Sequence, residues 1–566
     1  MKNGKSKTLS LGFPVFFVLF SLLPSPFSLS GQHAAHVVPS IPQALLERSV
    51  PIRSGIGTAH DDAGTKSPEA QAFYDQGLAY LHSFVWIEAA RSFHQALRHD
   101  PNLALAHVGL SYAYIELSLP ARAKQAITTA QALSSKAGDL STDLSAGARG
   151  AKVEAQSAKV DHERRHIEAR ALQMAAEDAA RDPARLAAYR KSLDAAIAGF
   201  PDDVELLLKR GMAESPDPAD RGQGSVLASL PFYERALKIS PNHFAARHFM
   251  AHAFENNGRM KEAVDAAASY ASQAPGVPHA RHMHGHELRR TGRIAEAIAQ
   301  FEAADKLQRD YLAKEKIAAE FDWHHAHNLD LLAASYQYVG QMRRAEGLLK
   351  QAFALPSNLL VQVVNKRDYP AFLVARGRPE EAVAAARTLT AHPHPVAQAA
   401  GHIETGFALL AMNRFAEGAN ASNAALRALK AAPDGQALAV IPLEALSGEF
   451  RLRTAQREQG RQAMERAAQK WRSLPGPDAW TQSLFRIEAL ARSARQVGDW
   501  PFAARMAQLM LEHDPDYAGT HFALGLVAHH DGNDATAKRE FALAAKAWAN
   551  ADRDLAELKT IADFRR

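Results

Sequence analysis

Two segments of the chain repeat one another at a fixed interval. One reads HFAARHFMAHAFENNGRMKEAV and the other VPHARHMHGHELRRTGRIAEAI, so that Gly258 recurs as Gly292, 34 residues later. Each segment also carries two histidines four residues apart. Self-similarity at a period of about 20–50 residues is typical of solenoids, in which each unit buries its apolar face against its neighbours. This period constrains the fold more than any other feature of the chain.

A third copy of the pattern lies in AQAFYDQGLAYLHSFVWIEAARSFHQALRHDP. Small and aromatic residues share one face of each of two expected helices, and a proline follows them: Phe73, Gly77 and Tyr80, then Ala89, Phe93 and Ala96, then Pro101. The small residues let two antiparallel helices approach closely, and proline cannot continue the second helix. The segment closely resembles the tetratricopeptide repeat (TPR), whose pattern has these residue types at these spacings.

Further copies lie at 104–134, 244–277 and 278–311 and around Gly340, Gly377, Gly498 and Gly532. Because no segment alternates convincingly with the two-residue period of a strand, we expect an all-α fold, a TPR-type superhelical solenoid of stacked antiparallel helix pairs. We divide the chain into a signal peptide (1–30), a flexible linker (31–66), an N-terminal TPR pair (67–134), degenerate helical repeats (135–225), a His-rich TPR block (226–360) and C-terminal TPR-like repeats (361–566).

The first 30 residues have the pattern of an export signal. MKNGKSK is basic, TLSLGFPVFFVLFSLL is apolar, and the small residues Ser28 and Ser30 suit cleavage before Gly31. The apolar run of about 16 residues is short for a bilayer of about 30 Å, and an uncleaved signal anchor is the alternative. We expect a periplasmic or secreted mature chain, with no stable membrane insertion after cleavage.

Composition narrows the kinds of site that the chain can hold. Cysteine is absent, which excludes disulfides, thiolate metal sites and a catalytic thiol. A net charge of +5 over 566 residues, with no concentrated basic run beyond the N-terminus, does not favour a nucleic-acid partner. Histidine is frequent, with 26 residues, so the candidate chemistry is that of imidazole.

The repeat predicts where the histidine pairs point. By resemblance to TPR proteins, the first helix of each pair lines the concave groove, which places His248, His252, His282 and His286 on the groove wall. Two histidines spaced i, i+4 share a helix face and suit Zn²⁺ or Cu²⁺. Packed helices lie about 8–10 Å apart, so imidazoles from neighbouring repeats can converge on one ion. These four histidines are the candidate metal ligands.

Other polar residues share the expected groove: Glu255, His279, Arg289, His327 and Asp330. Two other interpretations of the histidines stay open. In one they contact a peptide ligand, and in the other they are structural groups that bond to neighbouring helix ends. The stretches HARHMHGH and HNLDLLAASYQYVGQ resemble exported bacterial TPR proteins with H-M-x-x-H helices, over about residues 160–350. That resemblance implies no established activity.

One enzyme motif also occurs. His162-Glu163-Arg164-Arg165-His166 matches the HExxH pattern, in which two histidines bind zinc and the glutamate is the general base. In zinc peptidases that helix is mostly apolar, whereas here two arginines separate the histidines, and no spaced third ligand follows. We interpret 162–166 as an accidental match on a solvated helix face.

The function predicted from sequence is that of an exported, non-enzymatic scaffold that binds a protein or peptide partner in its concave groove, with a His-rich site at 244–330. The first alternative is a divalent metal-binding protein that uses the same histidines, and the second is a zinc metallopeptidase that uses 162–166. Apart from Zn²⁺ or Cu²⁺, no cofactor is expected.

Export gives the first testable prediction. Because basic, apolar and small residues follow one another before Gly31, the exported chain should begin after Ser30. Intact-mass measurement of the mature protein checks this. Recovery of exported protein that still carries Met1 would contradict a cleaved signal.

Overall fold

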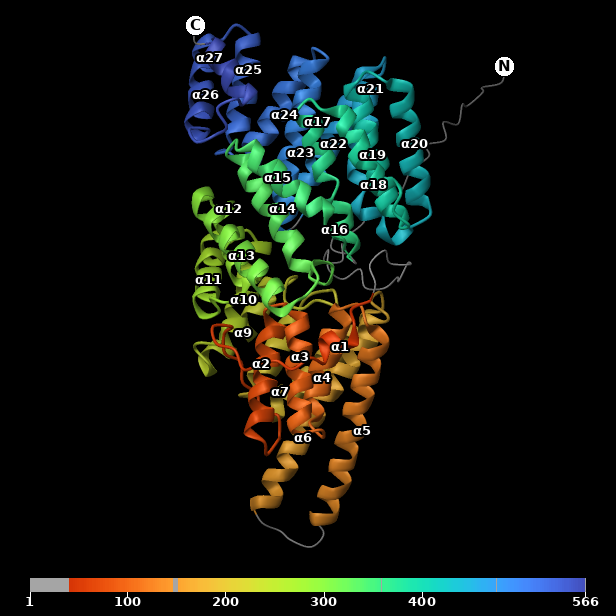
Figure 1. Ribbon diagram of the computed structural model, residues 1–566, viewed down its shortest axis with the longest axis vertical. Helices are drawn as coiled ribbons and strands as arrows, with labels where there is room; N and C mark the ends of the chain where they lie inside the picture. Colours follow the sequence, from red (N-terminus) through yellow and green to blue (C-terminus); the bar gives the residue numbers. More distant parts are fainter. Residues whose placement is uncertain (1–39, 146–150, 358, 475, 565–566) are drawn as a thin grey trace, which may run out of the picture.

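The computed structural model describes residues 40–145, 151–357, 359–474 and 476–564. Within these ranges every regular element is a helix, as the sequence predicted, and there is no strand. The predicted signal peptide lies outside the described residues. Figure 1 shows the repeats succeeding one another along the long axis, with the N-terminal repeats at one end and the C-terminal repeats at the other.

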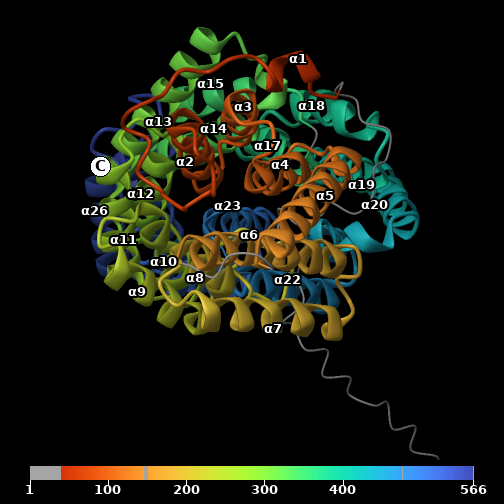
Figure 2. The ribbon, with the colours of Figure 1, turned by 90° about the horizontal axis from the view of Figure 1, so that it is seen from below.

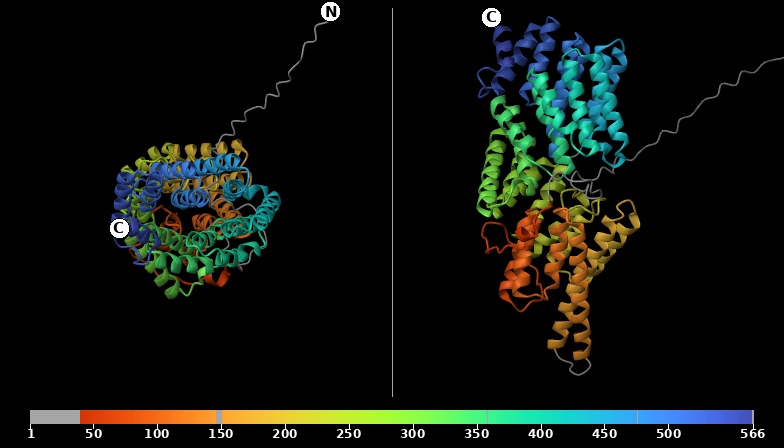
Figure 3. Two further views of the ribbon diagram at one scale, coloured as in Figure 1. Left: turned by 90° about the horizontal axis from the view of Figure 1, so that it is seen from above. Right: turned by 45° about the vertical axis from the view of Figure 1, so that its right-hand side comes forward.

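Helices pair with their neighbours in sequence. In the first part of the chain the pairs are α2 (Pro68–His82) with α3 (Trp86–His99), α4 (Ala104–Glu116) with α5 (Pro120–Ser145), α6 (Ala151–Glu177) with α7 (Pro183–Gly199), α8 (Val204–Met212) with α9 (Leu230–Ile239), α10 (Phe244–Asn256) with α11 (Met260–Gln273), α12 (Pro278–Arg290) with α13 (Ile294–Glu315), and α14 (Trp323–Tyr338) with α15 (Met342–Ala354). The region 135–225, predicted to be helical but off the period, holds the two long helices α5 and α6, whose tips project from the body (Figures 1 and 3).

The pairing continues to the C-terminal end. The pairs are α17 (Asp368–Ala375) with α18 (Pro379–Thr390), α19 (Pro395–Ala411) with α20 (Phe415–Lys430), α21 (Val440–Arg453) with α22 (Arg457–Arg472), α23 (Pro477–Gln496) with α24 (Trp500–His513), and α25 (Ala518–His530) with α26 (Asp534–Ala547). Short elements complete the fold: α1 (Gln43–Leu46), α16 (Leu360–Asn365), α27 (Ala556–Phe564) and 3-10 turns at Leu227–Ser229, Ala319–Phe321 and Pro433–Leu438.

Small residues and aromatic rings meet inside the pairs, as the repeat pattern requires. A Cβ atom added to Gly77 would lie 2.4 Å from the Phe93 ring, and one added to Gly285 would lie 2.8 Å from the Phe301 ring. Ala89 is fully buried in the same α2–α3 interface. These contacts confirm the predicted register, because only a residue without a bulky side chain leaves room for the ring.

The turn within a pair needs one residue in the left-handed backbone region. Gly258 and Gly292 supply it with φ of 71° and 75°. At the equivalent turn of the first pair the residue is Phe84, with φ of 59°, and in the second pair it is Ser118, also at 59°. Glycine adopts this conformation without steric cost, whereas a bulky residue does not.

The superhelix returns on itself, so that its first repeats pack against repeats far along the chain (Figures 2 and 3). Trp323 Nε1 donates a hydrogen bond to the Phe84 carbonyl oxygen at 3.0 Å, and Arg91 Nη1 lies 2.8 Å from Glu315 Oε2. A similar contact joins later turns, where Tyr338 donates to Asp514 at 3.2 Å. Segments more than 170 residues apart in sequence are therefore side by side.

Residues 40–66, predicted as part of a flexible linker, are instead packed on the repeats. Leu46 and Ile56 are buried, and the Arg53 backbone N–H donates to Gln76 of α2 at 2.7 Å. The segment lacks helical periodicity because it lies on α2 and α3 without forming a pair: Arg91 donates to the Arg48 carbonyl oxygen, and Gln76 to the Pro51 carbonyl oxygen. That is why its composition looked like a linker.

No membrane-spanning helix is found in the part of the chain that the structure covers, since its helices lack an apolar stretch of sufficient length.

Packing at Ala89 gives a second prediction. Ala89→Leu should lower the free energy of unfolding by about 1–3 kcal/mol, because the added atoms have no space between α2 and α3. Ala121→Leu, on an exposed position of α5, is the matched control and should change little. Urea unfolding of both variants measures the difference, and equal midpoints would contradict the α2–α3 register.

Candidate metal centre

The histidines predicted for the groove wall are buried. His248, His252, His282 and His286 are at most 4% exposed. The end of α2 and its turn cover the first pair: His248 Nδ1 donates to the His82 carbonyl oxygen at 2.8 Å, and the Phe84 ring centroid lies 4.8 Å from that of His248. The second pair lies against α14, with the His327 ring centroid 4.6 Å from that of His282. The prediction of an exposed groove wall is therefore wrong, because the first repeat covers His248 and His252, and α14 packs on His282 and His286.

Three of the buried imidazoles form a first triad: His248 and His252 of α10 and His279 of α12. His248 Nε2 lies 3.1 Å from His279 Nε2 and 3.2 Å from His252 Nε2. Two nitrogens bound to one tetrahedral Zn²⁺ are about 3.3 Å apart, given Zn–N distances of about 2.0–2.1 Å. Two of the three separations are thus close to that of ligands to a common ion, and all three ligand atoms lie within 4.8 Å of one another.

Hydrogen bonds among these rings cannot satisfy them all. The His82 carbonyl oxygen accepts only, so His248 carries its proton on Nδ1 and, when neutral, has a lone pair on Nε2. Both neighbouring rings would have to donate to that one lone pair. If His279 did so, its Nδ1 would lack a proton, and this buried atom has no hydrogen-bond partner. A cation bound between the three nitrogens would remove the competition for the His248 lone pair, because each ring could then direct a lone pair at the ion.

A second triad lies beside the first and consists of His282 and His286 of α12 and His327 of α14. Asn328 Nδ2 donates to the Phe301 carbonyl oxygen at 3.0 Å, which turns Asn328 Oδ1 toward His282 Nδ1 at 2.8 Å. His282 therefore has its proton on Nδ1, and its Nε2 is buried without a partner, as are both ring nitrogens of His286. His282 thus has an unprotonated Nε2, and the ligand atoms of the triad lie within 4.8 Å of one another.

His324 of α14 stands between the triads. Its ring centroid lies 4.7 Å from that of His282 and 5.3 Å from that of His279. Gln308 fixes its orientation, since Gln308 Nε2 donates to Asp322 at 2.8 Å and Gln308 Oε1 accepts from His324 Nδ1 at 3.0 Å. His324 Nε2 is buried without a partner. It is a seventh imidazole, beyond the six of the two triads.

Burial keeps most of these imidazoles neutral, which is the form that binds metal. Burial, and then the charges of neighbouring imidazoles, lowers the pKa of five of them well below the ordinary value: His248, His279, His282, His286 and His324. Burial lowers the pKa of His252 to about 3.

The other residues predicted for the groove have different positions. Glu255 is buried beside Glu287, and burial followed by the Glu255 charge raises the Glu287 pKa well above its usual range. Arg289 is buried between turns of the superhelix, with its guanidinium 4.0 Å from the Tyr338 ring centroid and 3.5 Å from Asp514. Asp330 is half-buried on α14 and belongs to neither triad.

The two histidines of the HExxH match on α6 contact aspartate side chains. His162 Nε2 and His166 Nε2 lie 2.8 and 2.7 Å from one oxygen of Asp203, and Asp61 is 3.4 Å from His162. Although burial opposes it, the hydrogen bonds to Asp203 and Asp61 raise the His162 pKa to about 10. The histidine side of α6 is thus partly buried, in contrast to the predicted solvated face, because residues 57–66 cover it.

The histidines and the two aspartates form an ion-pair network, and two further contacts disfavour a zinc peptidase site. Lys209 Nζ lies 3.0 Å from His166 Nδ1, so an ammonium group stands directly beside the imidazoles and repels a metal cation. Glu163, which would be the general base of a zinc peptidase, hydrogen-bonds Ser134 of α5.

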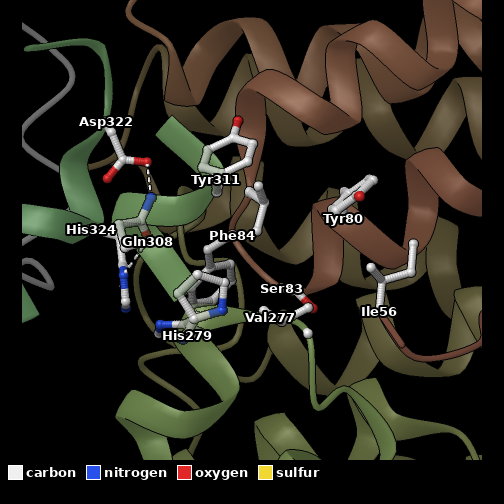
Figure 4. Close-up of a pocket in the computed structure, with 13 residues that line it drawn as sticks. Ile56, Tyr80, Ser83, Phe84, Val277, His279, Gln308, Tyr311, Asp322 and His324 are labelled. Carbon is white, nitrogen blue, oxygen red and sulfur yellow. Dashed lines mark hydrogen bonds between the residues drawn. The ribbon is translucent and has the colours of Figure 1, made fainter. Parts of the chain in front are cut away.

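A small pocket of about 70 Å³, partly open to solvent, adjoins the first triad. Figure 4 shows Asp322, Gln308 and His324 at one end, Tyr80 and Ile56 at the other, and Phe84, His279 and Tyr311 between them. Its walls are mainly aromatic and apolar, and the imidazoles of His279 and His324 line one side of it. This is the composition typical of a small-molecule site.

Comparison with known proteins agrees with the repeat pattern. The family model described as tetratricopeptide repeat matches residues 278–311, which contain the α12–α13 pair. The chain contains a tetratricopeptide repeat. Stacked repeats of this kind form extended surfaces that bind proteins, so the chain has the architecture of a protein-interaction scaffold. No curated protein matches it.

Solved structures with similarity to this TPR protein include three helical-repeat chains. The APC/C hetero-tetramer Cut9–Hcn1 has 11% identity and a TM-score of 0.31, over 88% of this chain and 97% of that chain. Yeast Tom70 has 12% identity and a TM-score of 0.30, over 88% and 95%. The P58(IPK) TPR domain has 13% identity and a TM-score of 0.18, over 60% and 92%.

The buried imidazoles predict a steep loss of stability in mild acid when no metal is bound. In the unfolded chain histidine binds a proton near pH 6.5, whereas the folded pKa values lie lower, so the unfolded state binds more protons as the pH falls. Each such histidine removes about 1.4 kcal/mol per pH unit below 6.5. For His252 this loss continues down to about pH 3.

The measurement is proton uptake on unfolding at pH 5, above the range where ordinary carboxyl groups titrate. His248, His252, His279, His282, His286 and His324 together should take up about six protons. His94 and His243, whose pKa burial lowers to about 4, should add about two more. Stability that is flat between pH 7 and pH 5 would contradict this picture.

Proposed function

We propose that this TPR protein binds d-block metal ions, Zn²⁺ or Cu²⁺, at its two buried histidine triads. The carrying observation is that all six imidazoles converge in two groups of three, with the ligand atoms of each group within 4.8 Å of one another. Neutral imidazole suits both ions, and the absence of cysteine leaves nitrogen as the softest strong donor in the chain. His248, His252 and His279 would hold one ion, and His282, His286 and His327 the other.

The hydrogen bonds behind the rings support this proposal. Metal-binding histidine usually donates its second N–H to a carbonyl or carboxylate group, which fixes the ring and its tautomer. His248 donates in this way to the His82 carbonyl oxygen and His282 to Asn328. In both cases the unprotonated nitrogen is the one that faces the other imidazoles. A duplicated peptide-contacting residue would need no such orientation.

Burial separates this proposal from that of a His-rich peptide groove. A peptide cannot reach side chains that are at most 6% exposed, as the members of both triads are. Protein binding by the scaffold therefore uses other surfaces of the solenoid, while metal binding uses its interior. Export, predicted from residues 1–30, would place the centre where Zn²⁺ and Cu²⁺ enter from outside the cell.

The proposal predicts uptake of about two equivalents of Zn²⁺ or Cu²⁺ by the chelator-stripped chain. His248→Gln and His282→Gln should each weaken one site by at least about 100-fold, since outer partners alone are worth about 10–100-fold. Asn328→Ala, which leaves His282 in place but removes its acceptor, should weaken the second site by about 10–100-fold. Titration calorimetry with elemental analysis measures both stoichiometry and affinity.

His530→Gln is the matched control, because His530 is exposed, stacks on Trp500 at 4.0 Å and belongs to no triad. Its metal binding should equal that of the unaltered chain. A chain that takes up no metal contradicts the proposal. So does a chain whose metal is lost on changing His166 of the α6 network while His248→Gln and His282→Gln retain it.

A further inference from the structure

Phe84 occupies a position where the backbone favours glycine. Its φ of 59° matches the left-handed turn that Gly258, Gly292 and Gly340 supply in other repeats. A bulky residue in this region is strained, and such strain persists only where surrounding contacts hold it. The backbone hydrogen bonds of this turn are formed although the residue is not glycine: Val85 N–H donates to the Tyr80 carbonyl oxygen at 3.0 Å. The strain is therefore tied to the presence of the side chain.

The Phe84 ring lies between the first triad and the pocket. Its centroid is 4.8 Å from that of His248 and 5.0 Å from that of His279, and the ring also stacks on Trp86 at 5.0 Å. On its other side the ring lines the pocket, where Figure 4 shows it beside His279 and Tyr311. Phe84 therefore lies between His248 and the pocket, while His279 of the same triad lines the pocket itself.

The pocket itself indicates what it accepts. Its aromatic walls, Tyr80, Phe84 and Tyr311, favour a flat apolar body. At the imidazole end, His324 Nε2 is buried without a partner, and His279 is both a pocket wall and a triad member. Three protein nitrogens on a tetrahedral ion leave one position for an outside ligand, the arrangement of catalytic and not of structural metal sites.

We propose that the pocket admits a small aromatic molecule with one nitrogen or oxygen donor to the ion of the first triad, and that Phe84 determines which molecules fit. This inference rests on metal binding by that triad. The triad is then a centre with an exchangeable fourth ligand, and Phe84 is a specificity-determining residue. The aromatic ring, in a turn that glycine would otherwise occupy, limits the length of the incoming molecule.

The test uses the full chain loaded with Co²⁺, whose visible absorption bands respond to a change of ligand. Imidazole, the short probe, should shift these bands in the unaltered protein. The longer 4-phenylimidazole should bind Phe84→Gly about tenfold or more tightly than the unaltered protein, because the ring that excludes it is gone. Phe84→Leu keeps a side chain in the turn and should give an intermediate affinity, which preserves the test if Phe84→Gly does not fold.

Ser118→Gly is the matched control, since Ser118 has the same φ of 59° at the equivalent turn of the next repeat and does not line the pocket. It should bind both probes as the unaltered protein does. Co²⁺ uptake without a band shift by either probe, or equal 4-phenylimidazole affinity in all variants, would overturn the inference and leave metal binding intact. Failure to take up Co²⁺ would overturn both.

Discussion

Burial of imidazole against imidazole is the constraint on which the rest of this structure depends. A buried nitrogen without a partner costs about 1–3 kcal/mol, and the triads, together with His324, hold several such atoms in a protein whose net stability is about 5–15 kcal/mol. A fold that only needed to close its core would place leucine or phenylalanine at these positions. The arrangement becomes favourable when a cation accepts the lone pairs, because ligand binding to the folded state alone adds to its stability.

The superhelix creates this environment by returning on itself. Residues on α10, α12 and α14 would be exposed in a short array, but the first repeat lies against them. The contact is specific: the His82 carbonyl oxygen orients His248, and the Phe84 carbonyl oxygen holds Trp323. The same elements that bury the histidines therefore also set their tautomers and form one wall of the pocket. Fold closure and ligand geometry are thus two results of the same packing.

The sequence predicted local features well and long-range ones poorly. The 34-residue period determined the helix pairs and the contact of Gly285 with Phe301, since both follow from residues within one repeat. It also identified members of both triads, because i, i+4 spacing places histidines on one helix face. It did not predict burial, which depends on residues 166 positions apart. Nor could it assign Gln308 and Asn328, whose roles arise only when two helices meet.

Departures from the repeat pattern, read together, indicate function more clearly than the pattern itself. Aligned with GRMKEA and GRIAEA, the first repeat reads FVWIEA, so Phe84 stands where glycine is required. The histidines likewise replace the apolar residues that solenoid interiors otherwise use. Natural sequences violate local rules mainly at functional or strained sites. Here both violations meet at one place, with the Phe84 ring 5.0 Å from His279. The strained turn at Phe84 and the buried imidazoles without partners each lower the stability of the fold. A functional site that uses both the ring and the imidazoles explains why they occur together.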